Sequence, residues 1–158
     1  IELAKHLRKT SSNVVCLHGD ELRQLFSLEA ELSENYDRNA RLALSFKYSQ
    51  FCQLLSEQGL IVIIATISMF KEIYAWNRKN LPGYFEAYLE IPIEELRRRD
   101  SKSIYSRYFR GELKNVAGLD LSIDEPIHAD WKFEFRRDQT VQLLAADLIT
   151  SIEKITNS

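Results

Sequence analysis

Residues 60–67 read Leu-Ile-Val-Ile-Ile-Ala-Thr-Ile, an apolar run without polar alternation. Runs of this kind are typical of strands in parallel sheets that are covered on both faces. We therefore expect residues 60–67 to lie at the centre of a parallel sheet. Gly59 comes directly before the run and is predicted to end a helix over residues 39–58 as its C′ residue. The helical stripe in that segment consists of Leu44, Tyr48, Phe51 and Leu55.

The rest of the chain alternates between strand and helix periods. Further strands are expected over residues 13–17, 84–91 and 131–135. Further helices are expected over residues 1–10, 20–26, 69–78 and 93–99, and after Asp138, which is predicted to cap the last one. Residues 27–38 are expected to form a loop, and residues 101–124 show no clear period. Strands separated by helices indicate right-handed crossovers and one three-layer α/β/α domain over residues 1–158 with a mostly parallel sheet.

Composition narrows the class of protein. The chain has 158 residues, of which 45% are hydrophobic and 28% charged, which suits one folded domain. Its net charge of −2 gives no general affinity for nucleic acid. Cys16 and Cys52 lie in apolar patterns, which argues against a disulfide framework and favours a reducing, cytoplasmic location. The longest apolar run is too short to cross a membrane, so no membrane partner is expected.

Ligands of parallel α/β sheets bind beyond the carboxyl ends of the strands. Asp20 follows one expected strand, and Arg23 lies on the same side if the segment is helical. The Asp20 carboxylate would orient or deprotonate a hydroxyl, help to hold magnesium, or simply cap a helix. Ile67 and Ser68 follow the central strand and are expected either to line a substrate cleft or, for Ser68, to cap the next helix. The three histidines show no metal-ligand spacing, so no metal cluster is predicted.

A second candidate feature is a basic segment between residues 97 and 114, in which seven bases oppose two acids, for a net charge of +5. Such a segment suits closure over a polyanionic substrate, where cations stabilise phosphoryl charge. A solvated face with scattered ion pairs is the alternative. The bases are Arg97, Arg98, Arg99, Lys102, Arg107, Arg110 and Lys114, and the acids are Asp100 and Glu112.

Four motifs in register resemble the adenylyl-sulfate kinase (APS kinase) family. They are residues 18–23 (HGDELR), 58–68 (QGLIVIIATIS), 99–105 (RDSKSIY) and 111–120 (GELKNVAGLD), and Glu125-Pro126 falls at the family's acidic-proline element. The resemblance implies a P-loop kinase of sulfate activation. Such an enzyme uses ATP and Mg²⁺ to phosphorylate the 3′-hydroxyl of adenylyl sulfate, giving 3′-phosphoadenylyl sulfate.

The resemblance also implies roles for individual residues. Asp20 matches the acid near the substrate hydroxyl, which makes it the candidate catalytic residue. The implied substrate-binding residues are Arg23, Arg41, Ile67, Ser68 and Lys102, with Arg38 as an alternative to Arg41. Lys102 lies at the start of a lid over about residues 100–125, and Arg110 and Lys114 belong to the same lid.

The sequence departs from the family pattern at several positions. His18 stands where the family has its first acid, Leu44 where it usually has Asn, and Ser103 where the lid has Gly. No Gly-x-x-x-x-Gly-Lys-Ser/Thr loop is present, and residues 1–10 look like the helix that should follow it. We therefore expect a kinase domain that lacks its first strand and P-loop and is nearly inactive in this form.

Two other functions stay open at this stage. One is a non-catalytic domain that binds a nucleotide or a partner, and the other is a P-loop kinase of another small alcohol. A homodimer and a fusion to another sulfate-activation domain are also compatible with the sequence.

Overall fold

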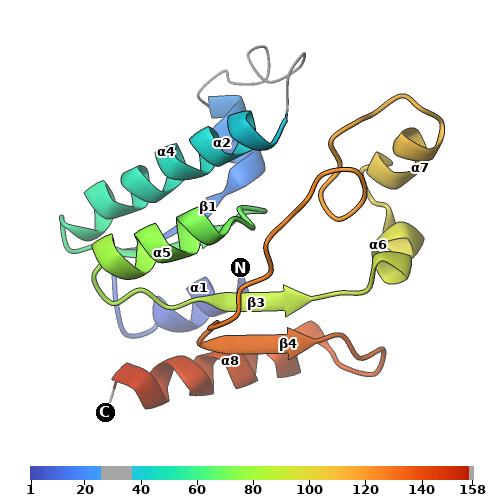
Figure 1. Cartoon of the computed structure of the whole chain (residues 1–158). Helices are drawn as coiled ribbons and strands as arrows, with labels where there is room; N and C mark the ends of the chain where they lie inside the picture. Colours follow the sequence, from blue (N-terminus) through green and yellow to red (C-terminus); the bar gives the residue numbers. More distant parts are fainter. Residues whose placement is uncertain (26–36, 157–158) are drawn as a thin grey trace.

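The structure is a computed structural model that describes residues 1–25 and 37–156. Two small parallel sheets form its centre (Figure 1). β1 (Val14–His18) pairs with β2 (Ile61–Ala65), and β3 (Ala87–Glu90) pairs with β4 (Trp131–Glu134). The helices are α1 (Glu2–Leu7), α2 (Gly19–Leu25), α4 (Arg38–Ser56), α5 (Lys71–Asn80), α6 (Ile93–Arg99), α7 (Ile104–Phe109) and α8 (Val141–Thr156).

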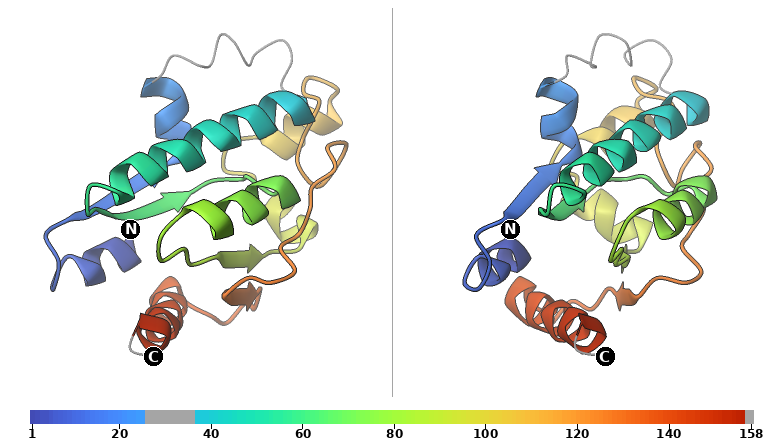
Figure 2. Two further views of the ribbon diagram at one scale, coloured as in Figure 1. Left: turned by 60° about the vertical axis from the view of Figure 1, so that its left-hand side comes forward. Right: turned by 90° about the vertical axis from the view of Figure 1, so that its left-hand side faces the viewer.

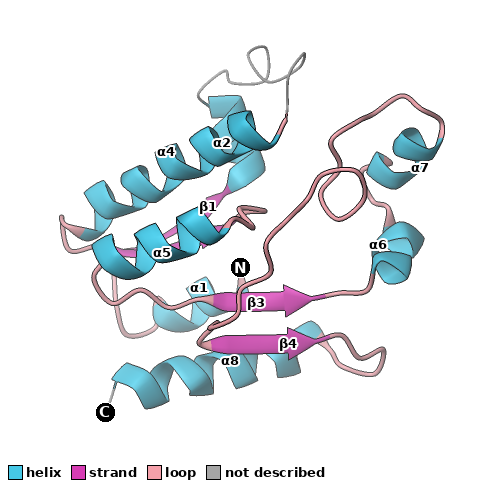
Figure 3. Cartoon of the chain, viewed as in Figure 1, coloured by secondary structure: helices cyan, strands magenta, loops and turns pink. Residues whose placement is uncertain are grey.

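The helices cover the strands in layers. α4 and α5 pack against each other on one side, with α4 against β2. α1 and α8 pack against each other on the other side, where α1 contacts β1 and α8 contacts β4. Figures 2 and 3 show the strands between these two groups of helices. The arrangement confirms the predicted three-layer α/β architecture with parallel strands.

α4 is the longest of the described helices, and its ends follow the capping rules. The Asp37 carboxylate accepts the N–H of Ala40 at 2.9 Å. At the other end the Gly59 N–H donates to the Ser56 carbonyl, and the next N–H donates to the carbonyl of Leu55, which is a Schellman motif. Gly59 has a φ of +82°, which only glycine adopts without strain. The predicted role of Gly59 as the C′ residue is confirmed.

The buried face of α4 packs against α2 and against the end of β1. Leu44 and Tyr48 form a core cluster with Leu22 of α2. The Tyr48 hydroxyl also donates to the carbonyl of Gly19 at 3.1 Å, in a buried position. α4 therefore fixes the junction at which β1 passes into α2.

The prediction that β2 lies at a sheet centre and is covered on both faces is wrong for the described residues. β1 is its one strand neighbour among them, and Ile61 is 38% exposed. β3 likewise pairs only with β4 within the described residues, and Leu89 is 52% exposed. An apolar strand is covered on both sides only when it has neighbours on both edges and helices on both faces.

Two local predictions are also corrected. Residues 101–124 contain a helix, α7, because the Asp100 carboxylate accepts the backbone N–H groups of Tyr105 and Ser106. Thr140 rather than Asp138 caps α8, since its hydroxyl accepts the N–H of Leu143 at 3.3 Å. Among residues 1–25 and 37–156, no helix is both long enough and apolar enough to cross a membrane.

Candidate functional site

The carboxyl ends of β1 and β2 meet, as the sequence predicted. His18 pairs with Ala65 at the ends of the two strands. The chain then passes so close to β2 that a Cβ on Gly19 would lie 3.2 Å from Thr66 Cγ2. The segment before Asp20 and the segment before Ser68 therefore lie side by side at one sheet edge.

Asp20 brings together two of the predicted cations. Its two carboxylate oxygens accept hydrogen bonds from Arg23 and from Lys102. α2 begins at Gly19, so Asp20 lies inside the first turn and the interpretation of Asp20 as the cap is wrong. The Asp20 side chain is 52% exposed, and an ion pair this exposed contributes little to stability. The Asp20–Lys102 ion pair instead fixes a position, because it holds Lys102 of segment 100–125 at the end of β1.

Arg41 contacts the same segment further along. Its guanidinium donates to the carbonyl of Asn115 at 2.7 Å. Asp120 folds this part of the segment into a compact loop by accepting the N–H groups of Asn115 and Val116. Partial burial opposes ionisation of Asp120, but the two N–H groups prevail and lower the pKa of its carboxyl.

Ile67 and Ser68 follow β2 at the shared carboxyl edge of β1 and β2, which we call the rim, where they were expected. Ile67 is 66% exposed. The hydroxyl of Ser45 donates to the Arg41 carbonyl at 2.8 Å and lies 3.0 Å from the oxygen of Ser68. The interpretation of Ser68 as a helix cap is wrong, because Phe70 occupies that position of α5 and caps it with no side-chain bond.

Arg38 forms a cluster that the sequence did not predict. Its guanidinium donates to Asp124 at 3.0 Å and to Glu72 at 3.2 Å, and it lies 5.1 Å from the ring centre of Phe70. Arg38 and Asp124 are 86 residues apart, so no local sequence pattern signals the pair.

The basic segment is more nearly neutral than its sequence indicated. Glu95 accepts two hydrogen bonds from Arg98 and one from Arg99, each at 2.7 Å, and these bonds hold the pKa of its carboxyl at about 2. Glu112 bonds Arg110 and also pairs with Arg107. Lys102 instead bonds Asp20, just after the carboxyl end of β1.

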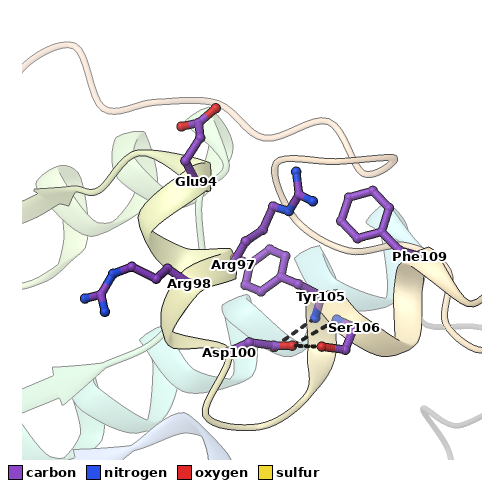
Figure 4. Close-up of a pocket in the computed structure, with 7 residues that line it drawn as sticks. All are labelled: Glu94, Arg97, Arg98, Asp100, Tyr105, Ser106 and Phe109. Carbon is purple, nitrogen blue, oxygen red and sulfur yellow. Dashed lines mark hydrogen bonds between the residues drawn. The ribbon is translucent and has the colours of Figure 1, made fainter.

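A pocket of about 470 Å³ opens between α6 and α7 (Figure 4). Arg97 lies over the ring of Phe109 there, 4.3 Å from its centre. The Asp100 carboxylate accepts a hydrogen bond from the Ser106 hydroxyl. The pocket is lined by α6 and by the start of segment 100–125, and none of Asp20, Ile67, Ser68 and Lys102 lines it.

Among the described residues, no group of three or more His, Cys, Asp or Glu side chains is placed to hold a metal ion. Magnesium usually binds one or two carboxylates together with substrate phosphates and water. Asp20 fits the role of one such carboxylate.

Parallel strands between helix layers, with cations and a carboxylate at their carboxyl edge, define a three-layer α/β domain with a ligand-binding edge. A family model described as "Adenylylsulphate kinase" matches residues 1–134. The chain belongs to this family, which confirms the resemblance found in the sequence.

Individual relatives are also described as kinases. The chain is 40% identical over 124 residues to the cytidine diphosphoramidate kinase of Campylobacter jejuni, covering 78% of this chain and 70% of the relative. It is 31% identical over 137 residues to a probable adenylyl-sulfate kinase of Pyrococcus abyssi, covering 87% and 76%. The solved Mycobacterium tuberculosis APS kinase CysC, in complex with AMPPNP and APS, matches with a TM-score of 0.81 at 24% identity, covering 96% of this chain and 87% of that one. This last match supports the fold.

Proposed function

We propose that the protein transfers the γ-phosphate of ATP to the ribose 3′-hydroxyl of a nucleotide whose phosphate carries a small acidic or amide group. One observation carries the proposal: Asp20 and Lys102, far apart in the sequence, meet at the shared carboxyl edge of β1 and β2. Phosphoryl transfer requires alignment and positive charge more than covalent chemistry, and this edge offers both.

Each residue of the site has a role in this proposal. Asp20 accepts the proton of the acceptor hydroxyl as that oxygen attacks the γ-phosphorus, and ADP leaves. Lys102 exchanges its bond to Asp20 for a bond to the acceptor's phosphate. Arg23 orients Asp20, while Ile67 and Ser68 line the acceptor's side of the site. Arg41 binds the acceptor, and Arg110 and Lys114 belong to a lid over residues 100–125 that closes on it.

ATP and Mg²⁺ fit the charge of the site. Bound magnesium would neutralise charge that develops on the phosphoryl oxygens. Asp20 is the carboxylate placed to approach it, and His18 supplies no second one. The 158 residues contain no glycine-rich phosphate loop, and the second edges of β2 and β3 carry no strand within the described residues. We propose that a strand bearing the phosphate loop pairs with these open edges of β2 and β3. Activity would then require this strand and its loop.

Two acceptors have support. Cytidine diphosphoramidate is favoured because the relative of that specificity is 40% identical, and because His18, Leu44 and Ser103 depart from the pattern of adenylyl-sulfate kinases. Adenylyl sulfate is the second candidate, supported by the four sequence motifs and by the Pyrococcus relative. A cytoplasmic location, a single domain over residues 1–158, and a homodimer or fused sulfate-activation domain stay proposals.

The test is transfer of phosphate from ATP to each acceptor, with the position of the new phosphate read by phosphorus NMR. We expect a 3′-phosphorylated product when residues 1–158 are joined to a segment that carries the phosphate loop. Lys102→Ala should raise the acceptor KM about tenfold with little change for ATP, because one charged hydrogen bond is lost. Asp20→Asn should lower kcat about 100-fold or more if the carboxylate acts as the base.

Lys132→Ala is a matched control for Lys102→Ala. Lys132 is also exposed and paired with a carboxylate, Glu90, at 2.9 Å, but it lies on β4 away from the rim. A folded protein that binds ATP yet phosphorylates neither acceptor would reject both substrates. Calorimetry that detects acceptor binding without turnover would instead indicate a non-catalytic domain.

A further inference from the structure

The first turn of α4 holds the far end of segment 100–125. Asp124 lies near the end of that segment, and its carboxylate bonds both Arg38 and the backbone N–H of Lys71. Its backbone is held as well, because its N–H donates to the Met69 carbonyl at 2.9 Å and its carbonyl accepts the Tyr74 hydroxyl at 2.9 Å. Four bonds therefore fasten this residue to α4, to α5 and to the loop between β2 and α5.

The point of attachment lies next to the site. Met69 directly follows Ser68, which we propose to line the acceptor's side of the site. Phe70 is 1% exposed and forms the floor under the Arg38 guanidinium. The end of the segment thus cannot shift without disturbing either the rim loop or Arg38.

Arg38 also separates two negative charges. Glu72 and Asp124 both accept hydrogen bonds from the same terminal nitrogen of Arg38. Without the guanidinium, two half-exposed carboxylates would face each other and repel. Loss of Arg38 therefore removes an attraction and creates a repulsion at the same attachment point.

We propose that Arg38 is a positioning residue, which sets where residues 115–124 lie against the acceptor site by pairing with Asp124 and Glu72, and that it is not an acceptor ligand. Arg41 supports the same segment one helical turn later, through the Asn115 carbonyl. The start of α4 thus holds residues 115–124 at both ends, at Asn115 and at Asp124. The effect on acceptor binding rests on the proposed function, whereas the position of the segment does not.

The test compares Arg38→Gln, Asp124→Asn and the double variant in residues 1–158 joined to the segment that carries the phosphate loop. Hydrogen exchange reports the amides of residues 115–123, and calorimetry reports the affinity for cytidine diphosphoramidate and for ATP. We expect each single variant to speed exchange about tenfold, as for loss of one charged hydrogen bond in a local opening. Acceptor affinity should fall by a similar factor while ATP affinity is kept. Because the two residues act through one contact, the double variant should match the single variants within about twofold.

Arg78→Gln is the matched control. Arg78 also pairs with an aspartate, Asp130, at 2.7 Å and lies 5.0 Å from the ring centre of Tyr84, but it sits in the last turn of α5. Its loss should leave exchange at 115–123 unchanged. Arg38→Lys keeps the charge and should speed exchange at residues 115–123 less than Arg38→Gln does. It replaces Arg38→Gln in the test if that variant folds poorly.

Three results would overturn the proposal. One is wild-type exchange at 115–123 in Arg38→Gln, and another is acceptor loss in the double variant that equals the sum of the single losses. The third is an equal effect of Arg78→Gln at residues 115–123. If the wild-type protein bound neither nucleotide, the proposed function would fail, and the exchange data would still decide whether Arg38 positions the segment.

Discussion

At the scale of single residues, Glu95 decides how much free positive charge α6 presents. Its side chain is 6% exposed and bonds two of the three consecutive arginines. Counting bases from Arg97 gives +5, but starting at Glu94 adds two acids and reduces the net charge to +3. The helical spacing of three and four residues between Glu95 and its partners was visible in the sequence.

Glu95→Gln should destabilise the protein in a pH-dependent way. The folded-state pKa of Glu95 is about 2 against an ordinary 4.5, because Arg98 and Arg99 bond the ionised form. A lowered folded-state pKa contributes stability above pH 4.5, and this is lost as the pH falls towards 2. Urea unfolding of both proteins should show a gap at pH 7 that narrows between pH 4.5 and 2. A constant gap across this range would contradict the assignment.

Asp20 and Arg41 show what residue patterns predict about the site. A polar residue after a buried strand is a local signal, so the place of Asp20 at the sheet edge was predictable. The partners of these residues were not. Lys102 is 82 residues from Asp20, and Asn115 is 74 residues from Arg41. Such contacts depend on how the layers pack, and neither spacing nor composition records that.

At the scale of elements, the strands were easier to predict than the helix ends. β-Branched runs marked β1 and β2 to within a few residues. α7 was missed, since its start depends on Asp100 with a φ of +24° and Ser103 with a φ of +54°. Residues 27–36 of the expected loop lie outside the described residues, and Arg38, its expected last residue, begins α4. The exposure of β2 was unpredictable from its own residues, because it depends on which strands lie beside it.

Thr140→Ala should lower the free energy of unfolding by about 1 kcal/mol, as is usual for loss of a helix cap. The Thr140 hydroxyl accepts the N–H of Leu143, and without it this group lacks a protein partner. Asp138→Ala is the control, because Asp138 is exposed and lies before the cap. Chemical denaturation of both variants measures the difference. A larger loss for Asp138→Ala would restore Asp138 as the cap.

At the scale of the whole molecule, the described residues contain two parallel strand pairs, which are connected by helix packing, such as that of α1 against α8, and not by strand hydrogen bonds. Residues 14–65 contain β1 and β2, and residues 87–134 contain β3 and β4. Elements that share few hydrogen bonds tend to open as separate units. We therefore expect the two sheets to exchange their amide hydrogens independently.

Tyr48→Phe tests this independence. It removes the hydroxyl that bonds the Gly19 carbonyl, and should reduce protection in β1 and β2 by about 1 kcal/mol. Protection in β3 and β4 should stay at the wild-type value when exchange is followed in low denaturant. Equal loss of protection in both sheets would show that they open together.

The turn closed by Asp120 has a consequence for recognition. Val116 and Leu121 are buried at its base, and the carboxylate fixes two successive amides. Chain entropy at this turn is therefore lost during folding and not during ligand capture. In the proposed function this turn belongs to the lid and closes as one preformed unit, so acceptors that differ in the size of the base should separate chiefly in their dissociation rates.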